Sequence, residues 1–147
     1  MAETAILIPR LPDPDEAGVL KPSSEWPVWR RDELKLNTRN GRVGGFLASE
    51  SERARVWNIW LLPGERLPFH RHVLDYFWTT TSAGRGRSHF WDGRVVESDY
   101  KLGDTKHFRV EKDGWFIHDL ENIGDTPLGF VAVEFLNSAN IPLVLRD

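Results

Sequence analysis

The apolar residues of this chain come in short runs, many of them alternating with polar residues, and turn residues interrupt them every 8 to 12 positions or so. From Trp26 onward, no stretch shows the sustained 3.6-residue periodicity of an amphipathic helix. Side chains alternate between the two faces of a strand, so runs of this kind predict strands. About eight such strands predict an all-β fold, either a sandwich or a small barrel.

The predicted strands are separated by clusters of glycine, proline, serine and acidic residues. They are Gly44–Ala48, Ala54–Leu62, Phe69–Thr80, Arg85–Trp91, Arg94–Asp99, Thr105–Val110, Trp115–Leu120 and Leu128–Leu136. Asp92 and Gly93 lie between two of these runs, and both residues suit the positive φ angles of a type I′ turn. We therefore expect a β-hairpin at this point.

The beginning of the chain has a different composition. Five of the nine prolines lie within residues 9–27, which predicts an extended arm over residues 1–25. The remaining residues, 26–147, are enough for a single barrel domain. The apolar segment Ala5–Ile8 could add a strand to a neighbouring sheet and cover its edge, so we expect a homodimer.

Charge and composition argue against several classes of partner. The formal net charge of −3 and the scattered lysines and arginines provide no basic surface for a nucleic acid. The sequence before Asp15 resembles neither a signal peptide nor a membrane span, so we expect a soluble, cytoplasmic protein without a membrane partner. There is no cysteine, so any metal ion must be held by nitrogen and oxygen ligands.

Three histidines form the strongest candidate site. His70 and His72 are two positions apart in a predicted strand, so their side chains share one face. His118 lies in a later strand and would complete a three-nitrogen site for one divalent transition metal ion: iron, nickel, zinc, copper or manganese. His89 and His107 have no such partner, and we expect surface or hydrogen-bonding roles for them.

Two sequence motifs resemble those of the cupin superfamily. The first is Pro63-Gly64, five residues and then His70-Arg71-His72, and the second runs from Gly114 through His118 to Asn122 and Gly124. The resemblance implies a double-stranded β-helix, often dimeric, with the three histidines at the barrel mouth. Within the superfamily, Arg71-His72 followed by Asp75-Tyr76 is similar to small bacterial cupins linked to β-alanine degradation.

The chain also departs from the cupin pattern. Many cupins carry a glutamate four or five residues after the second histidine, where this sequence has Tyr76 and Phe77. The usual spacing to the next glycine favours Phe77 at the missing position, whereas unbroken alternation favours Tyr76. A Tyr76 hydroxyl that faced the site would be a catalytic proton donor. Asp75 should point outward, but a bulge after His72 would turn it inward as an additional ligand.

Three neutral nitrogen ligands would leave open positions on a bound ion for a small-molecule substrate or ligand. Cupins with three histidines and no glutamate include dioxygenases, so the resemblance implies a dioxygenase-type oxidoreductase acting on a small carboxylate or aromatic-like metabolite. Two alternatives use the same residues: a ligand-binding or sensing protein without turnover, and an oxygen-independent isomerase or lyase. The expected pocket walls are Trp60, Trp78 and Phe116.

Overall fold

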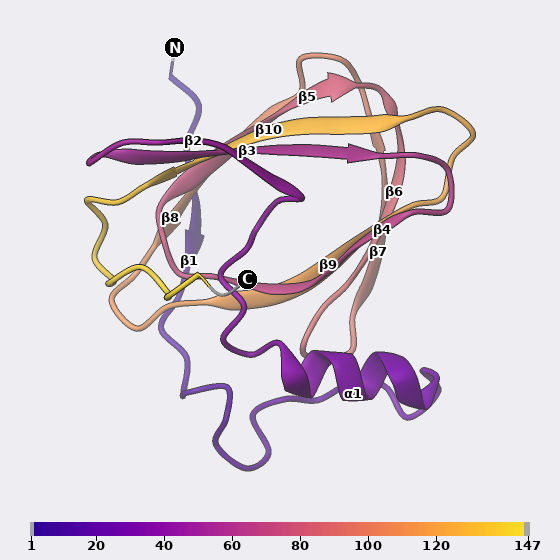
Figure 1. The fold of residues 1–147 in the computed structure, drawn as a ribbon. Helices are drawn as coiled ribbons and strands as arrows, with labels where there is room; N and C mark the ends of the chain where they lie inside the picture. Colours follow the sequence, from indigo (N-terminus) through magenta and orange to yellow (C-terminus); the bar gives the residue numbers. More distant parts are fainter. Residues whose placement is uncertain (1, 146–147) are drawn as a thin grey trace.

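The computed structural model describes residues 2–145 and consists mainly of two β-sheets that face each other (Figure 1). The larger sheet has the strand order β1 (Ile6–Ile8), β8 (Thr105–Val110), β5 (Tyr76–Ser82), β10 (Leu128–Phe135), β3 (Ala54–Leu61) and β2 (Phe46–Glu50). The smaller sheet has the order β4 (Arg66–His72), β9 (Phe116–Asn122), β6 (Gly84–His89) and β7 (Val95–Tyr100). The predicted all-β fold is therefore confirmed. Residue 1 of the predicted arm and residues 146–147 of the predicted domain lie outside the described residues.

The prediction of one continuous strand over Phe69–Thr80 is wrong, because the chain leaves β4 after His72 and enters β5 at Tyr76. Val73 and Leu74 turn away from the barrel interior and are buried in a second apolar cluster. The Asp75 carboxylate accepts a hydrogen bond from the backbone N–H of Val110 at 2.8 Å. This three-residue crossing carries the chain from the smaller sheet to the larger one.

The hairpin predicted at Asp92-Gly93 joins β6 to β7, but its turn is not of type I′. Phe90 and Arg94 pair across a three-residue loop, in which the N–H of Gly93 donates to the carbonyl of Phe90 at 3.0 Å. Only Gly93 has a positive φ, of 92°. A type I turn followed by a left-handed glycine is the usual form of such a loop.

The helix α1 (Val28–Leu36) was not predicted. It begins after Pro27, whose φ of −59° suits the entry to a helix. Its only fully buried apolar residue is Leu34, whereas Trp29 and Leu36 are 51% and 84% exposed. The helix therefore has no apolar stripe, and periodicity could not reveal it.

The N-terminal segment packs along its own chain. β1 pairs in parallel with β8, so it covers the edge of the larger sheet of the same molecule. Residues 9–27 contain no helix, and several hydrogen bonds attach them to the barrel. Trp115 Nε1 donates to the carbonyl of Pro12, and Lys21 N donates to the carbonyl of Trp91. The apolar strand that suggested a homodimer thus already has a partner within its chain.

The apolar core has two parts. One fills the barrel between the sheets and contains Trp57, Ile59, Leu67, Leu120 and Phe130. The other lies on the outer face of the smaller sheet, where residues of α1 and the N-terminal segment cover Phe69, Trp115 and Ile117. Among residues 2–145, no helix is long and apolar enough to cross a membrane.

Candidate metal centre

The three predicted histidines come together through the pairing of two strands. His70 and His118 are directly opposite each other in the antiparallel pair of β4 and β9, and His72 lies one pleat further along the same face. The register shifts between Leu67 and His70, where β4 carries one extra residue. Pro68 lies in this bulge, a position that a residue without a backbone N–H tolerates.

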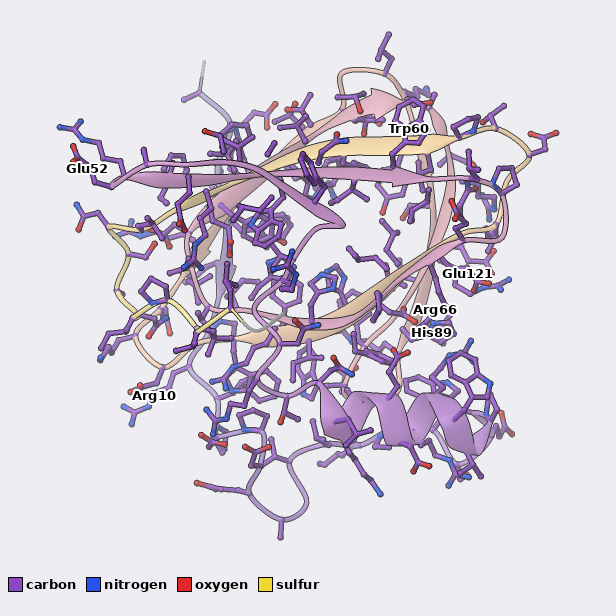
Figure 2. The ribbon with its side chains drawn as sticks, in the orientation of Figure 1. Arg10, Glu52, Trp60, Arg66, His89 and Glu121 are labelled. Atoms are coloured by element: carbon purple, nitrogen blue, oxygen red, sulfur yellow. The ribbon has the colours of Figure 1, made fainter. Side chains whose placement is uncertain are left out.

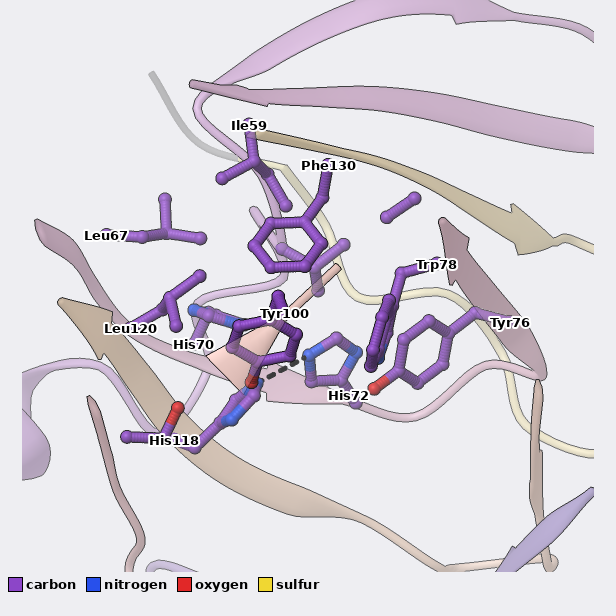
Figure 3. A pocket seen from close by; sticks show the side chains of 13 residues that line it. Ile59, Leu67, His70, His72, Tyr76, Trp78, Tyr100, His118, Leu120 and Phe130 are labelled. Carbon is purple, nitrogen blue, oxygen red and sulfur yellow. Dashed lines mark hydrogen bonds between the residues drawn. The ribbon is translucent and has the colours of Figure 1, made fainter. Parts of the chain in front are cut away.

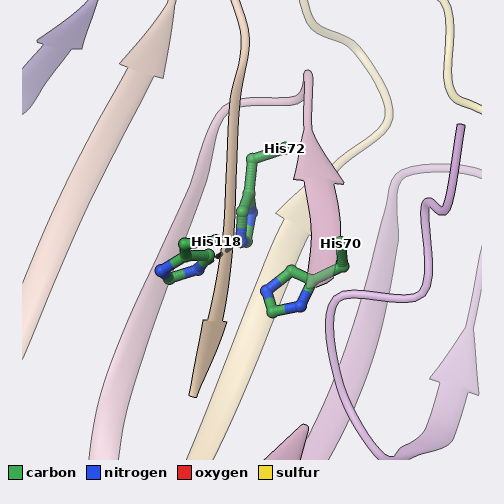
Figure 4. Close-up of side chains that lie close together, drawn as sticks. All are labelled: His70, His72 and His118. Atoms are coloured by element: carbon green, nitrogen blue, oxygen red, sulfur yellow. Dashed lines mark hydrogen bonds between the residues drawn. The ribbon is translucent and has the colours of Figure 1, made fainter. Parts of the chain in front are cut away.

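Hydrogen bonds and distances orient the three imidazoles toward one point (Figure 4). His70 Nδ1 donates to the carbonyl of Pro68 at 2.8 Å, which leaves its Nε2 free to act as a ligand. The Nε2 atoms of His72 and His118 lie 3.2 Å apart. Two nitrogens bound to one ion at about 2.1 Å each, at angles between octahedral and tetrahedral, would be separated by about 3.0 to 3.4 Å. The spacing of His72 and His118 therefore fits a shared ion, and the ligand nitrogens of all three histidines lie within 4.8 Å of one another.

Burial keeps these imidazoles neutral. It lowers the pKa of His70 to about 4, although the hydrogen bond to Pro68 opposes the shift. Burial also lowers the pKa of His72 and of His118 well below the usual value, and the neighbouring histidines lower both further. Neutral imidazole is the form that binds metal ions, so the donor set suits the transition metal ion that the sequence predicts.

Of the two residues at the position of the missing glutamate, Tyr76 faces the site and Phe77 does not. Tyr76 is 3% exposed, and its ring stacks on His72 with 4.3 Å between the ring centroids. Burial raises the pKa of its hydroxyl well above the usual value, so the phenol stays protonated. Phe77 lies on the opposite face of β5, beside His107 and Phe135.

Asp75, the proposed additional ligand, lies outside the histidine group. Among the described residues, the only group of side chains arranged to hold a metal ion is His70, His72 and His118. The Asp75 carboxylate is bonded to the backbone of β8 instead. No bulge turns Asp75 inward, because the chain crosses between the sheets at this point. The prediction of Asp75 as an additional ligand is therefore wrong.

A small cavity of about 60 Å³ adjoins the histidines inside the barrel (Figure 3). Trp78, a predicted pocket wall, lines it, and Phe116 stacks on His72 with 4.5 Å between the ring centroids. The prediction for Trp60 is wrong, because this residue is 52% exposed on the outer face of the barrel (Figure 2). In β3 the residues that face inward are Trp57, Ile59 and Leu61.

Several residues of the pocket were not predicted. Ser88, Tyr100 and Phe130 line the cavity together with Leu67 and Leu120. Tyr100 lies one residue beyond the predicted end of its strand, which is why it was missed. Strand alternation could have identified Phe130, since it shares the inward face of β10 with Ala132 and Glu134.

Glu134 is a buried carboxylic acid within the barrel. It is 3% exposed and accepts a hydrogen bond from Trp57 Nε1 at 2.7 Å. Burial raises its pKa to about 7, although this hydrogen bond opposes the shift. Glu134 and Tyr76 are directly paired across β10 and β5, so their side chains share the inward face.

A network of buried charged residues lies on the face of β9 that points away from the histidine site; Arg66 and His89 belong to it (Figure 2). The Asp119 carboxylate accepts hydrogen bonds from Arg66 Nη2 at 2.7 Å and from the backbone N–H and Nδ1 of His89 at 2.6 and 3.0 Å. Arg66 also forms a two-pronged contact with Glu33 of α1. Burial alone would raise the pKa of Asp119, but the bonds from His89 and Arg66 hold it below its usual value. His89 therefore has the hydrogen-bonding role expected for it.

Comparison with known proteins relates the fold to solved structures. Neither a protein-family model nor a curated protein sequence matches the chain. A cupin-domain protein from Bordetella pertussis is 24% identical, with a TM-score of 0.53, over 61% of this chain and 88% of that one. A conserved protein with a double-stranded β-helix domain from Klebsiella pneumoniae is 25% identical, with a TM-score of 0.50, over 64% of this chain and 76% of that one. With its two facing sheets and paired histidine strands, the chain has the double-stranded β-helix fold of these cupin structures.

Proposed function

We propose that this protein is a metal-dependent enzyme, a dioxygenase-type oxidoreductase that acts on a small organic molecule. The observation that supports the proposal is the convergence of three buried, neutral imidazoles beside a cavity. His70, His72 and His118 would hold one divalent transition metal ion. Such an ion, when bound, polarises substrate oxygens and, if it is iron, permits chemistry with dioxygen.

The surrounding side chains determine what can approach this centre. The cavity has room for about two water molecules, so only a small group of a substrate fits beside His70 and His72. Most of the walls are apolar or aromatic, including Leu67, Leu120 and Phe130. Tyr76 is stacked on His72 with its hydroxyl protonated, so it can donate a hydrogen bond or a proton to a substrate atom.

The metal site can be tested by elemental analysis of protein purified without chelators. We expect a near-stoichiometric content of one transition metal, and its loss in the double variant His70→Ala, His72→Ala. The matched control is His107→Ala, which removes an exposed histidine on the outer face. Folding of each variant is checked by circular dichroism. A wild-type protein that remains metal-free after incubation with each candidate ion would refute the proposal.

Turnover distinguishes between classes of reaction. A dioxygenase consumes oxygen in step with its substrate, and this is measured with an oxygen electrode on the metal-loaded protein. The buried, protonated Tyr76 favours one second candidate, an oxygen-independent isomerase or lyase that needs a proton donor. That enzyme would form product under anaerobic conditions, and Tyr76→Phe would slow it without reducing metal content. Thermal stabilisation by a ligand without any product would instead indicate a binding protein.

A further inference from the structure

A second, larger cavity lies beside the histidine site and is lined in part by His118. Its volume is about 580 Å³, within the range of roughly 300 to 1,000 Å³ that small-molecule sites occupy. It shares Tyr76, Trp78, Ser88, Tyr100 and His118 with the small cavity, so the two lie side by side. We call this larger space the outer groove.

The N-terminal segment forms one wall of the outer groove. Ile6 pairs with Phe108 in β8, and Phe108 pairs with Tyr76 in β5. Directly paired residues face the same way, so these three side chains form one continuous surface. Ile8 and Leu11 extend this wall. Four further aromatic residues line the groove: Phe90, Trp91, Trp115 and Phe116.

The charged residues that line the outer groove are both cations, Arg94 and Lys106, and its lining includes no carboxylate. The Lys106 side chain is exposed and forms no hydrogen bond or ion pair within the described part of the chain. Arg94 Nε donates to Asp92 at 2.8 Å, and its guanidinium lies 4.6 Å from the centre of the Phe90 ring. Because Asp92 already balances the charge of Arg94, Lys106 is the cation left to pair with a ligand. A groove with apolar walls and one such cation complements a molecule with an apolar body and one negative charge.

We propose that the outer groove binds a monocarboxylate with an apolar tail, and that Lys106 holds its carboxylate. The small cavity of about 60 Å³ admits only the opposite end of this molecule to the histidines. The inference rests on the proposed function in one respect: the end of the molecule that reaches the histidines is taken to be the end that reacts. The binding itself does not require a metal ion.

Calorimetric titration of the purified full-length chain tests the proposal with three probes. They are 4-phenylbutyrate, its neutral primary amide and acetate. We expect the acid to bind about tenfold more tightly than the amide, because only the acid makes charge-assisted contacts. Acetate lacks the apolar body and should not saturate the site at millimolar concentrations. Equal affinity of the acid and the amide would overturn the proposal.

Matched variants then locate the contacts. Lys106→Gln should weaken binding of the acid about threefold to tenfold and leave the amide unchanged. Arg109→Gln removes a cation from the outer face of the same strand and should change neither affinity. If the His70→Ala, His72→Ala variant lost the acid while Lys106→Gln kept it, the carboxylate would bind at the histidines and the proposal would be wrong.

The wall formed by β1 has its own test. Ile6→Ser should weaken binding of both the acid and the amide, because both probes carry the apolar tail. Leu7→Ser, on the outward face of the same strand and 55% exposed, is the matched control.

The groove and the proposed function can fail independently. A metal-free or inactive protein that still prefers the acid would refute the proposed function alone. A metal-loaded, active enzyme without this preference would refute the groove alone.

Discussion

Glu134→Gln should remove one specific component of the pH dependence of stability. The carboxyl of Glu134 has a pKa of about 7 in the folded protein, against an ordinary value of 4.5. Because the folded state binds this proton more tightly, the stabilisation is fully present below pH 4.5 and is lost as the pH rises through 7. Each pKa unit corresponds to about 1.4 kcal/mol, so the full effect is about 3 kcal/mol.

The variant retains an acceptor oxygen for Trp57 Nε1 but cannot ionise. We therefore expect Glu134→Gln to gain about 2.5 kcal/mol over the wild type between pH 5 and pH 8. The three buried histidines lose stabilisation as the pH falls below 6.5, since burial lowers the pKa of each. Their contribution is common to both proteins and cancels in the difference.

The assay is equilibrium unfolding in urea at half-unit steps of pH, with both proteins in the same buffers. The control variant is Glu52→Gln, which removes an exposed carboxylate in the turn before β3 and should follow the wild type at every pH. A difference between Glu134→Gln and wild type that stayed constant within about 0.5 kcal/mol would refute the reasoning. It would mean that Glu134 is ionised in the folded protein throughout this range.

Two further predictions concern stability and use the same unfolding assay. Gly44→Ala should cost about 1 to 3 kcal/mol, because an added Cβ would lie 2.6 Å from Cβ of the fully buried Trp57. Gly45→Ala is its control, since the nearest atom is 3.7 Å away, and an equal loss there would contradict the packing argument. Asp119→Ala should cost about 3 kcal/mol by leaving Arg66 with only its carboxylate partner in α1. A loss below about 1 kcal/mol would show that the buried network contributes little.

The sequence predicts the barrel well because its signal is local. Strand alternation depends only on neighbouring residues, and the predicted strand Thr105–Val110 matches β8 at both ends. The same rule places His70 and His72 on one face, and the motif spacing adds His118. Arg85 and Arg87 are also two positions apart and share one face of β6. They pair with acidic residues on the exposed face of β7.

Other features depend on contacts between distant residues, and the sequence could not predict them. The break after His72 arises because Val73 and Leu74 are buried on the far side of the smaller sheet. No local pattern indicates that crossing, so the orientation of Asp75 and Tyr76 stayed open. Similarly, α1 is held by Leu34 and by the ion pair of Glu33 with Arg66, which no periodicity reveals.

The pairing of β1 with β8 has a consequence for the order of folding. Residues 6–8 and their partners, residues 108–110, are about 100 positions apart in the chain. Contacts over such a separation form late, because the loop between them must first lose most of its conformational freedom. During synthesis, β1 leaves the ribosome long before β8 exists. The outer groove would therefore be completed last, and a chain with an otherwise formed barrel would still lack one wall of this groove.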